Sequence, residues 1–196
     1  MNRPRRAKSS QPQKAHSNIR IIGGKHRGRK LPVLNAEGLR PTTDRVKETL
    51  FNWLMMSIHD SHCLDCFAGA GSLGFEAYSR GASSVTMLEL NKDVAKQLQV
   101  NKQALSADTI NVVTVDALQF LQAPNNKIDI AFVDPPFHQG LTQKTIDMLA
   151  AGWLAPGANV YVEQESQLVE PSVPESWQLI KEKTAGQVTY RLYEVE

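Results

Sequence analysis

The sequence contains little cysteine, no long apolar run, and no acidic residue in its first 36 positions. Its two cysteines, Cys63 and Cys66, cannot form the disulfide framework of a small secreted protein, so we expect a reducing, cytoplasmic location. No apolar run approaches the roughly 20 residues that a membrane-spanning helix requires. The N-terminus also lacks the apolar segment of a signal peptide. These absences predict a cytoplasmic protein with no membrane partner.

The missing acidic residues are matched by an excess of basic ones at the same end of the chain. Residues 1–36 hold ten of the 22 Lys and Arg, which leaves twelve against twenty Asp and Glu in the rest, a net charge of −8. A basic segment attached to an acidic body favours binding to a polyanion, most often a nucleic acid. Polar tails of biased composition are also commonly disordered without a specific role, and residues 1–17 stay open between these interpretations.

The length and composition predict one folded domain with a small N-terminal extension. A chain of 196 residues with 41% hydrophobic residues has enough apolar side chains for a core. We expect a disordered basic tail over residues 1–17, a basic β-hairpin around a Gly-rich turn over 18–35, and the main domain over 36–196. The hairpin carries the basic residues that we expect to bind nucleic acid: Arg20, Lys25, Arg27, Arg29 and Lys30.

Beyond the hairpin, the apolar pattern predicts a helix and then alternating strands and helices. One helix face is marked by Val46, Leu50, Trp53 and Leu54, with Thr42 or Thr43 as the N-cap. Repeated βα units then run to residue 165, and two final strands meet around Ala185-Gly186. The pattern predicts an α/β, Rossmann-like fold with a mostly parallel seven-stranded sheet ending in an antiparallel hairpin.

The residues that follow the predicted strands predict a ligand site. Ligands of such folds lie beyond the carboxyl ends of the strands, where this sequence places a glycine loop at 69–74, then Glu89, Asp116 and Asp134. The loop reads G-x-G-x-x-G, and Glu89 lies 20 residues after Gly69, as expected for an acid that holds the ribose of an adenosine-bearing ligand. A plain strand-to-helix turn is the alternative.

Two features favour S-adenosylmethionine over NAD as that ligand. Asp65 precedes Gly69 by four residues, where a carboxylate would attract the ammonium of a methionine moiety and repel a pyrophosphate. The sequence shows no obvious arrangement for accepting a hydride. An NAD-dependent oxidoreductase remains the alternative. Measuring which of the two cofactors binds would distinguish it from a methyltransferase.

The fourth strand of the alternating region ends in Asp134-Pro135-Pro136-Phe137, a stiff segment with a carboxylate and a ring. Each proline fixes its own φ and restricts the residue before it. The segment resembles the [N/D]-P-P-[Y/F] motif of class I methyltransferases that act on exocyclic amino groups. That resemblance implies that the Asp side chain and the first proline's carbonyl accept hydrogen bonds from the amine, while the ring stacks on the base. An ordinary Asp-Pro turn is the alternative.

Four motifs together narrow the resemblance to a single family of these methyltransferases: "RIIGGKHRGRKL", "RPTTDRVKETLFNWL", "DCFAGAGSLGFEA" and "FVDPPF". From about residue 19 to the C-terminal hairpin the chain resembles the bacterial 16S ribosomal RNA guanine-N2 methyltransferases, which modify guanine 966 of the small-subunit RNA. The resemblance implies catalysis by Asp134, Pro135, Pro136 and Phe137. It implies that the cofactor S-adenosylmethionine is bound by Asp65, Phe67, Ala68, Gly69, Gly71, Glu89, Asp116 and Ala117, with Arg40, Thr43 and Arg45 as further candidates.

The resemblance also implies a partner, 16S rRNA within the small ribosomal subunit or a late assembly intermediate. We expect a monomer without a metal, because a zinc site needs about four well-placed ligands and the two cysteines flank a buried strand. His138 beside the Asp-Pro-Pro-Phe segment is either a substrate contact or a solvated loop residue. Trp53, Trp153 and Trp177 are expected in the core.

Two other functions remain open at this point. A DNA adenine or cytosine amino-methyltransferase would use the same catalytic motif, although the chain has little room for a base-reading domain. A non-catalytic RNA-binding or ribosome assembly factor would keep the fold without turnover.

Overall fold

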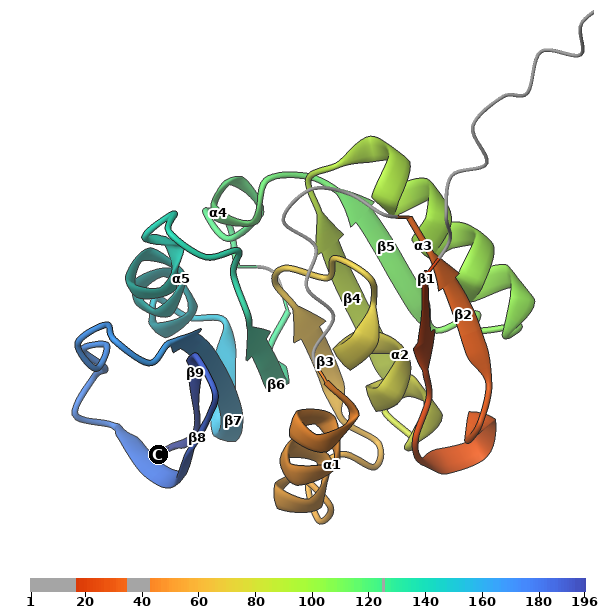
Figure 1. Cartoon of the computed structure of the whole chain (residues 1–196). Coiled ribbons are helices and arrows are strands. Elements are labelled where there is room, and N and C mark those ends of the chain that lie inside the picture. Colours follow the sequence, from red (N-terminus) through yellow and green to blue (C-terminus); the bar gives the residue numbers. More distant parts are fainter. Residues whose placement is uncertain (1–16, 35–42, 125) are drawn as a thin grey trace, which may run out of the picture.

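The computed structural model describes residues 17–34, 43–124 and 126–196, which form an α/β unit (Figure 1). Arg40 and the tail before Ser17 lie outside these residues. The small sheet pairs β1 (Ser17–Arg20) with β2 (Lys30–Val33). The strands of the large sheet are β3 (His62–Asp65), β4 (Ser84–Glu89), β5 (Ile110–Thr114), β6 (Ile128–Val133), β7 (Leu154–Glu165), β8 (Trp177–Ala185) and β9 (Val188–Val195).

The large sheet has the order β5-β4-β3-β6-β7-β9-β8, which confirms the predicted seven strands. Strands β3 to β7 run parallel, whereas β9 is antiparallel to both β7 and β8. Ala185 pairs with Val188, so the hairpin turn is Gly186-Gln187, one residue later than predicted. The chain reverses its direction of strand addition between β3 and β6, and ligands of this fold class bind at the carboxyl ends beside that point.

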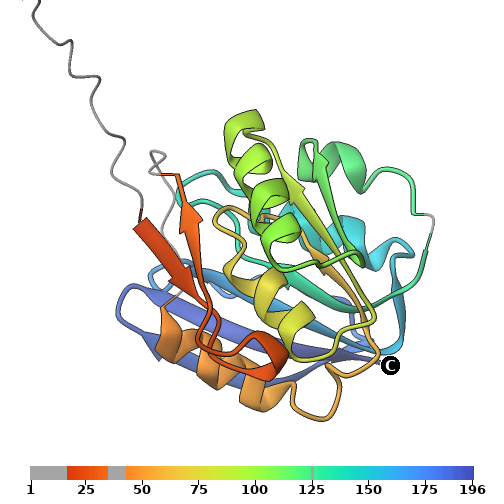
Figure 2. The same ribbon diagram turned by 90° about the vertical axis from the view of Figure 1, so that its right-hand side faces the viewer.

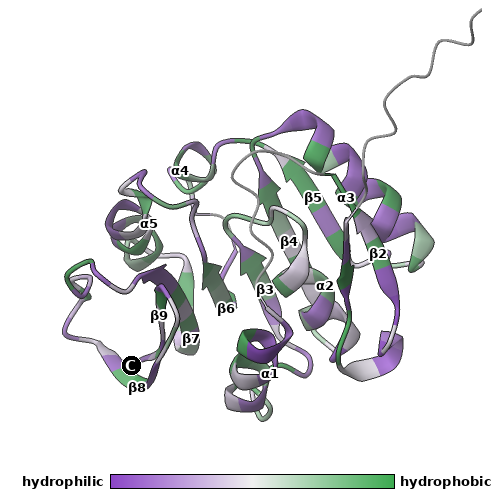
Figure 3. Cartoon of the chain, in the orientation of Figure 1, coloured by the Kyte–Doolittle hydropathy of each residue, from purple (hydrophilic) through white to green (hydrophobic). Residues whose placement is uncertain are grey.

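Helices cover both faces of the sheet (Figure 2). The helices are α1 (Asp44–Trp53), α2 (Ser72–Ser79), α3 (Lys92–Ala104), α4 (Ala117–Phe120) and α5 (Leu141–Ala150). Buried side chains of α1, α2 and α3 share one apolar core with one face of the sheet, and those of α4 and α5 share a second core with the other face. The hydropathy colouring of Figure 3 shows apolar strands between helices of mixed polarity, the pattern of a sheet buried on both faces.

Helix α1 begins as its sequence predicts, with Thr43 as the N-cap. The Thr43 hydroxyl oxygen accepts a hydrogen bond from the Val46 amide at 3.4 Å, and Asp44 occupies the first turn. The predicted stripe is confirmed at Val46, Leu50 and Leu54. Trp53 is only partly buried, and its ring lies tilted against that of Tyr190 with 5.4 Å between centroids. Trp53 therefore lies at the edge of the core, where it packs beside Tyr190 of β9. Trp153 and Trp177 are buried as predicted.

The N-terminal hairpin packs onto the main core instead of standing apart from it. A short 3-10 helix, η1 (Gly24–His26), lies between its two strands. The apolar side chains that alternate along the hairpin join the core shared with α2 and α3: Ile19, Ile21, Leu31 and Val33. Gly24 has φ +72°, and a Cβ there would lie 1.8 Å from the Ser79 carbonyl oxygen, so only glycine permits this approach to α2.

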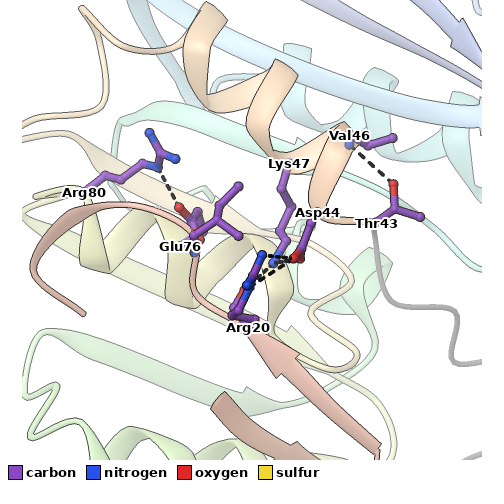
Figure 4. Close-up of polar contacts among 8 residues, drawn as sticks. Arg20, Thr43, Asp44, Val46, Lys47, Glu76 and Arg80 are labelled. Carbon is purple, nitrogen blue, oxygen red and sulfur yellow. Dashed lines mark hydrogen bonds and ion pairs between the residues drawn. The ribbon is translucent and has the colours of Figure 1, made fainter. Parts of the chain in front are cut away.

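Figure 4 shows the polar contacts that join the hairpin to the helices. The Lys47 ammonium is buried and donates to the Arg20 carbonyl oxygen at 2.6 Å, while it lies 3.2 Å from Asp44. The Arg20 guanidinium pairs with the same Asp44 carboxylate at 3.1 Å. Asp44 at the start of α1 therefore holds both a hairpin cation and a buried lysine.

Among residues 17–34, 43–124 and 126–196, no helix has the length and apolarity needed to cross a bilayer.

Candidate active site

The acidic residues predicted at strand ends lie along one edge of the sheet. Asp65 ends β3 and pairs with Met87 on β4 and Phe132 on β6, so the carboxyl ends of these three strands are neighbours. Glu89 ends β4 two residues after Met87, and Asp134 follows β6 two residues after Phe132. The strand order therefore brings the glycine loop and the Asp-Pro-Pro-Phe segment to adjacent positions on one rim.

The glycine loop runs from β3 into α2 in a tight turn, as the motif predicts. Gly69 and Gly71 have φ of +50° and +81°, the left-handed region that glycine adopts without strain. A Cβ on Gly71 would lie 2.5 Å from the Phe75 ring, and one on Gly74 would lie 2.9 Å from Met87. The three glycines thus permit both the turn and the close packing of α2 against the sheet.

Glu89 both organises this loop and leaves room for a ligand. One carboxylate oxygen accepts from the Gly69 amide at 2.9 Å, and the other accepts from the Asn91 amide at 2.7 Å. A carboxylate offers about four acceptor positions. Because Glu89 is half-buried, its remaining lone pairs suit the vicinal hydroxyls of a ribose.

Asp65 is buried beneath the loop, with 2% of its surface exposed. Its carboxylate accepts from the Gly74 amide at 3.1 Å and from the Phe67 amide. Burial is the largest influence and raises the pKa of Asp65 from 3.8 to about 7, although the two amides oppose this shift and the charge of Glu89 adds to it. The carboxylate therefore supports the loop from below, and its expected contact with an ammonium remains a prediction.

Because its pKa is raised, Asp65 should make the cofactor-free protein less stable as the pH rises from about 4 to about 7. The unfolded chain releases this proton near 3.8, whereas the folded chain keeps it to about 7. Across that window the native state binds more protons, so the free energy of unfolding falls as pH rises. Urea unfolding of wild type and Asp65→Asn at about pH 4.5 and about pH 7.5 isolates this contribution. Equal pH dependence in both proteins would contradict the assignment.

The third acid, Asp116, follows β5 and caps α4. Its carboxylate accepts from the Gln119 amide at 3.0 Å, and Ala117 behind it is buried. Phe67 and Ala68 lie in the turn between β3 and the glycines, where the Ala68 amide donates to the Leu88 carbonyl at 2.9 Å. These contacts place all the predicted cofactor residues between 65 and 117 on the carboxyl rim of β3, β4 and β5.

Ser72 is a candidate site residue that the motif reading missed. It is the first residue of α2 and is 7% exposed, and its hydroxyl has no hydrogen-bond partner among the described residues. The amides of a first helical turn also lack partners within their helix. A buried hydroxyl beside such amides fits the carboxylate of a methionine moiety. The serine directly after G-x-G, at the start of the helix, is the sequence signal that would have found it.

The Asp-Pro-Pro-Phe segment leaves β6 beside β7. Asp134 is half-buried, Pro135 is buried and Pro136 is exposed, while the Phe137 ring packs partly against the core. Val133 pairs with Val162, so Asp134 and Glu163 follow at neighbouring positions.

Glu163, which the motif reading also missed, accepts from the Tyr161 hydroxyl at 2.7 Å. Burial, then the charges of Glu163 and Asp134, raises the pKa of Tyr161 well above its usual value. The Asp134 carboxylate thus lies near the Tyr161–Glu163 pair of the neighbouring strand, close enough for its charge to act on the Tyr161 hydroxyl.

The remaining candidates near α1 have other partners or lie outside the described residues. Thr43 caps α1 with its hydroxyl, and Arg45 is exposed on the first turn. Arg40 falls outside the described residues. The roles of these three residues toward a cofactor remain predictions.

No group of three or more His, Cys, Asp or Glu side chains in the described residues is arranged to hold a metal ion. Cys63 and Cys66 are both buried free thiols. Burial raises the pKa of Cys63 to about 12 and raises that of Cys66 as well, so both remain protonated. They pack as small apolar side chains.

Comparison with known proteins agrees with this arrangement. Residues 19–194 match the family model described as conserved hypothetical protein 95. The chain is 55% identical to ribosomal RNA small subunit methyltransferase D of Haemophilus influenzae over 193 residues, covering 95% of this chain and 99% of that protein. The structure of the putative methyltransferase yhhF from Escherichia coli has a TM-score of 0.87 and 51% identity, covering 92% of this chain and 99% of that one.

A more distant structure shares the fold alone. The RNA methyltransferase from Salinibacter ruber, in complex with S-adenosyl-L-homocysteine, is 17% identical with a TM-score of 0.59, covering 80% of this chain and 94% of that one.

The strand order, the glycine loop and the acids along the rim define a class I methyltransferase whose cofactor is S-adenosylmethionine, as predicted, and not NAD. Within that class, the chain belongs to the family of ribosomal RNA small subunit methyltransferase D. The predicted family resemblance is thereby confirmed.

Proposed function

We propose that this protein methylates the exocyclic N2 of a guanine in 16S ribosomal RNA, at the position numbered 966 in its family. The observation that carries the proposal is the Asp134-Pro135-Pro136-Phe137 exit from β6, which lies beside the glycine loop on one rim. The names of the relatives support ribosomal RNA as the substrate. The segment indicates an exocyclic amine as the methyl acceptor, and the family resemblance favours N2 of guanine among such amines.

The cofactor residues proposed on the rim match the successive parts of S-adenosylmethionine. The half-buried carboxylate of Glu89 would hold the ribose hydroxyls, Asp116 would hold the adenine amino group, and Ser72 would hold the methionine carboxylate. When bound there, S-adenosylmethionine supplies an activated methyl group on a positively charged sulfur. The acids of the rim favour that positive charge.

Asp134 and Pro135 are proposed to act on the amine itself. The nitrogen of an aromatic amine is a poor nucleophile because its lone pair is delocalised into the ring. Two fixed acceptors, the Asp134 carboxylate and the Pro135 carbonyl, hold the amine hydrogens and stabilise the charge that develops as the methyl group arrives. The amine proton becomes acidic only during transfer, so a positioned carboxylate suffices as its acceptor.

Phe137 is proposed to stack on the target base. Its ring is half-buried against the core, which leaves one part available for contact. A base reaches this position only when it is unstacked, which costs less in an RNA loop than in a duplex. This cost favours a single-stranded RNA target over duplex DNA.

The hairpin of residues 18–35 is proposed as the RNA-binding extension of a methyltransferase domain over 36–196. All five of its candidate cations are exposed. They differ in their partners: Arg20 pairs with Asp44, and Lys25 lies 3.7 Å from the centre of the Tyr78 ring. Arg29 donates to the Ala104 carbonyl at 3.3 Å. The aromatic contact and the neutral carbonyl leave the charges of Lys25 and Arg29 available to phosphates.

Replacing Lys25, Arg27 and Lys30 together with glutamine should weaken RNA binding and reduce its salt dependence. The slope of log affinity against log salt concentration should fall by about 1 for each lost phosphate contact. Arg20 stays in place because its pair with Asp44 holds the hairpin to α1. Affinity for small-subunit RNA, measured across a salt series, checks this prediction.

A matched control removes the same charge from the opposite edge of the molecule. Lys144, Lys181 and Lys183 are exposed on α5 and on the edge strand β8. Their triple glutamine variant should bind RNA with the wild-type salt slope. Equal slopes for both triple variants would remove the hairpin as the phosphate contact.

The test of the function is transfer of a labelled methyl group from S-adenosylmethionine to three acceptors: unmodified small subunits, naked 16S RNA and duplex DNA. We expect N2-methylguanosine in subunits, because the proposed acceptor is the small subunit or a late assembly intermediate. The enzyme is proposed to act as a monomer. Label in naked RNA alone would place the reaction before assembly. Label in DNA alone, or in no acceptor, would overturn the proposal in favour of a DNA amino-methyltransferase or a non-catalytic factor.

A further inference from the structure

The loop that follows Phe137 is held by a carboxylate from the neighbouring strand. Glu165 is the last residue of β7, and its side chain is 10% exposed. One of its carboxylate oxygens accepts from the His138 amide at 2.7 Å and lies 3.3 Å from Nδ1 of the same histidine. A nearly buried acid thus makes two contacts with the residue that directly follows the Asp-Pro-Pro-Phe segment.

His138 has a backbone conformation that needs such support. Its φ of +62° lies in the left-handed region, which histidine occupies at an energetic cost. The next fixed point along the chain is Gly140, at φ +62°, the N-cap of α5. Between the end of β6 and this cap, the Glu165 carboxylate is therefore a contact that holds the main chain of the loop at its strained residue.

The anchor itself is rigid. β7 is paired on both sides, with β6 in parallel and with β9 in antiparallel orientation, and Glu165 pairs with Val188. On the same strand Tyr161 and Glu163 lie four and two positions before it, so all three side chains share one face of the sheet. This face also carries the core against which the Phe137 ring packs. The position of the loop is thus tied to a strand that pairs with β9 as far as Glu165 itself.

We propose that Glu165 is a positioning residue for methyl transfer. Its bond to the His138 amide holds the main chain just after Phe137, so that the ring and the Asp134–Pro135 acceptors keep their mutual geometry while the base enters. The role acts through the loop and requires no contact of Glu165 with the substrate. This inference rests on the proposed function of Asp134 to Phe137.

The two contacts of Glu165 can be told apart, because each predicts that a different set of variants loses methyl-transfer activity. If the amide bond is the essential one, His138→Ala keeps it and retains activity, and Glu165→Gln keeps an acceptor oxygen and retains most activity. Glu165→Ala removes the acceptor. If instead the imidazole and the carboxylate acted as an ionised pair, His138→Ala and Glu165→Gln would both fail together with Glu165→Ala.

Kinetics of the wild type and four variants, with saturating S-adenosylmethionine and the best RNA acceptor, test the positioning role. A displacement of reacting groups by about 1 Å can cost up to about 100-fold in rate. We expect Glu165→Ala to lose about 10- to 100-fold in kcat, with the Kd for cofactor within about twofold of wild type. Glu165→Gln and His138→Ala should stay within about threefold. Glu175→Ala, which removes an exposed carboxylate after β7, is the matched control and should equal wild type.

Hydrogen exchange at the His138 amide gives a readout independent of turnover. Exchange should be slow in wild type, Glu165→Gln and Glu175→Ala, and fast in Glu165→Ala. A fully active Glu165→Ala, or a Glu165→Gln as impaired as the alanine variant, would overturn the positioning role alone. Absence of methyl transfer by the wild type to any acceptor would overturn the proposed function and this inference with it.

Discussion

Asp134→Ala is expected to lower kcat for methyl transfer by about 100-fold or more, while the Kd for S-adenosylmethionine stays within about twofold of wild type. A rate loss of this size is typical when one preorganised group that stabilises charge in the transition state is removed. Cofactor affinity should persist because the cofactor residues proposed on the rim lie at the ends of β3, β4 and β5 or in the segments that follow them, whereas Asp134 follows β6. Single-turnover kinetics with saturating RNA, together with calorimetric cofactor binding, separate the two quantities.

Asp134→Asn is the matched control for this prediction. Its amide keeps an acceptor oxygen at the same position, and the resembling motif carries either Asn or Asp there, so the variant should retain more activity than Asp134→Ala. Unchanged turnover in the alanine variant would show that Asp134 takes no part in transfer. A large loss of cofactor affinity in that variant would instead assign the residue to the cofactor.

Glu76→Ala is expected to cost about 3 kcal/mol of unfolding free energy. Glu76 is 0% exposed in the middle of α2, where one oxygen accepts from the Ile22 amide at 2.8 Å and the other accepts from Arg80 Nε at 2.7 Å (Figure 4). Removing one partner of a buried ion pair typically costs about 3–5 kcal/mol, and the lower figure applies because the Arg80 side chain is partly exposed. At roughly 2–4 °C per kcal/mol, Tm should fall by about 6–12 °C.

The same variant should loosen the hairpin before it disturbs the sheet, because Ile22 lies in the hairpin and Glu76 in α2. RNA binding should therefore weaken at temperatures where the fold is intact. Glu48→Ala removes an exposed carboxylate from α1 and should change the unfolding free energy by less than about 0.5 kcal/mol. A Glu76→Ala variant as stable as Glu48→Ala would show that the buried carboxylate contributes nothing to stability.

Features with a local signature were predictable from the sequence. The α1 cap at Thr43 and the order of strands and helices follow from spacing and capping, which operate within a few residues. The glycine loop followed from a motif whose residues need left-handed φ values and close packing. The carboxyl-end rule then placed Glu89, Asp116 and Asp134 on one rim without coordinates.

Contacts between distant segments were decided only by the tertiary structure. Glu76 and Lys47 are charged residues, a type that is rarely buried completely, yet both are buried. Their partners, the Ile22 amide and the Arg20 carbonyl, lie 54 and 27 positions away. Glu165, likewise, meets His138 across 27 positions because β7 pairs with β6.

The sequence by itself therefore determined the elements, their order and the acids and glycines of the cofactor rim, because each depends on local spacing or on a rule of the parallel sheet. Only the tertiary structure decided that the basic hairpin packs on α2 and α3, that Ser72 presents a buried hydroxyl, and that Glu165 holds the loop after Phe137. Periodicity reports which face of an element is buried, whereas the partner on that face depends on how the whole chain folds back on itself.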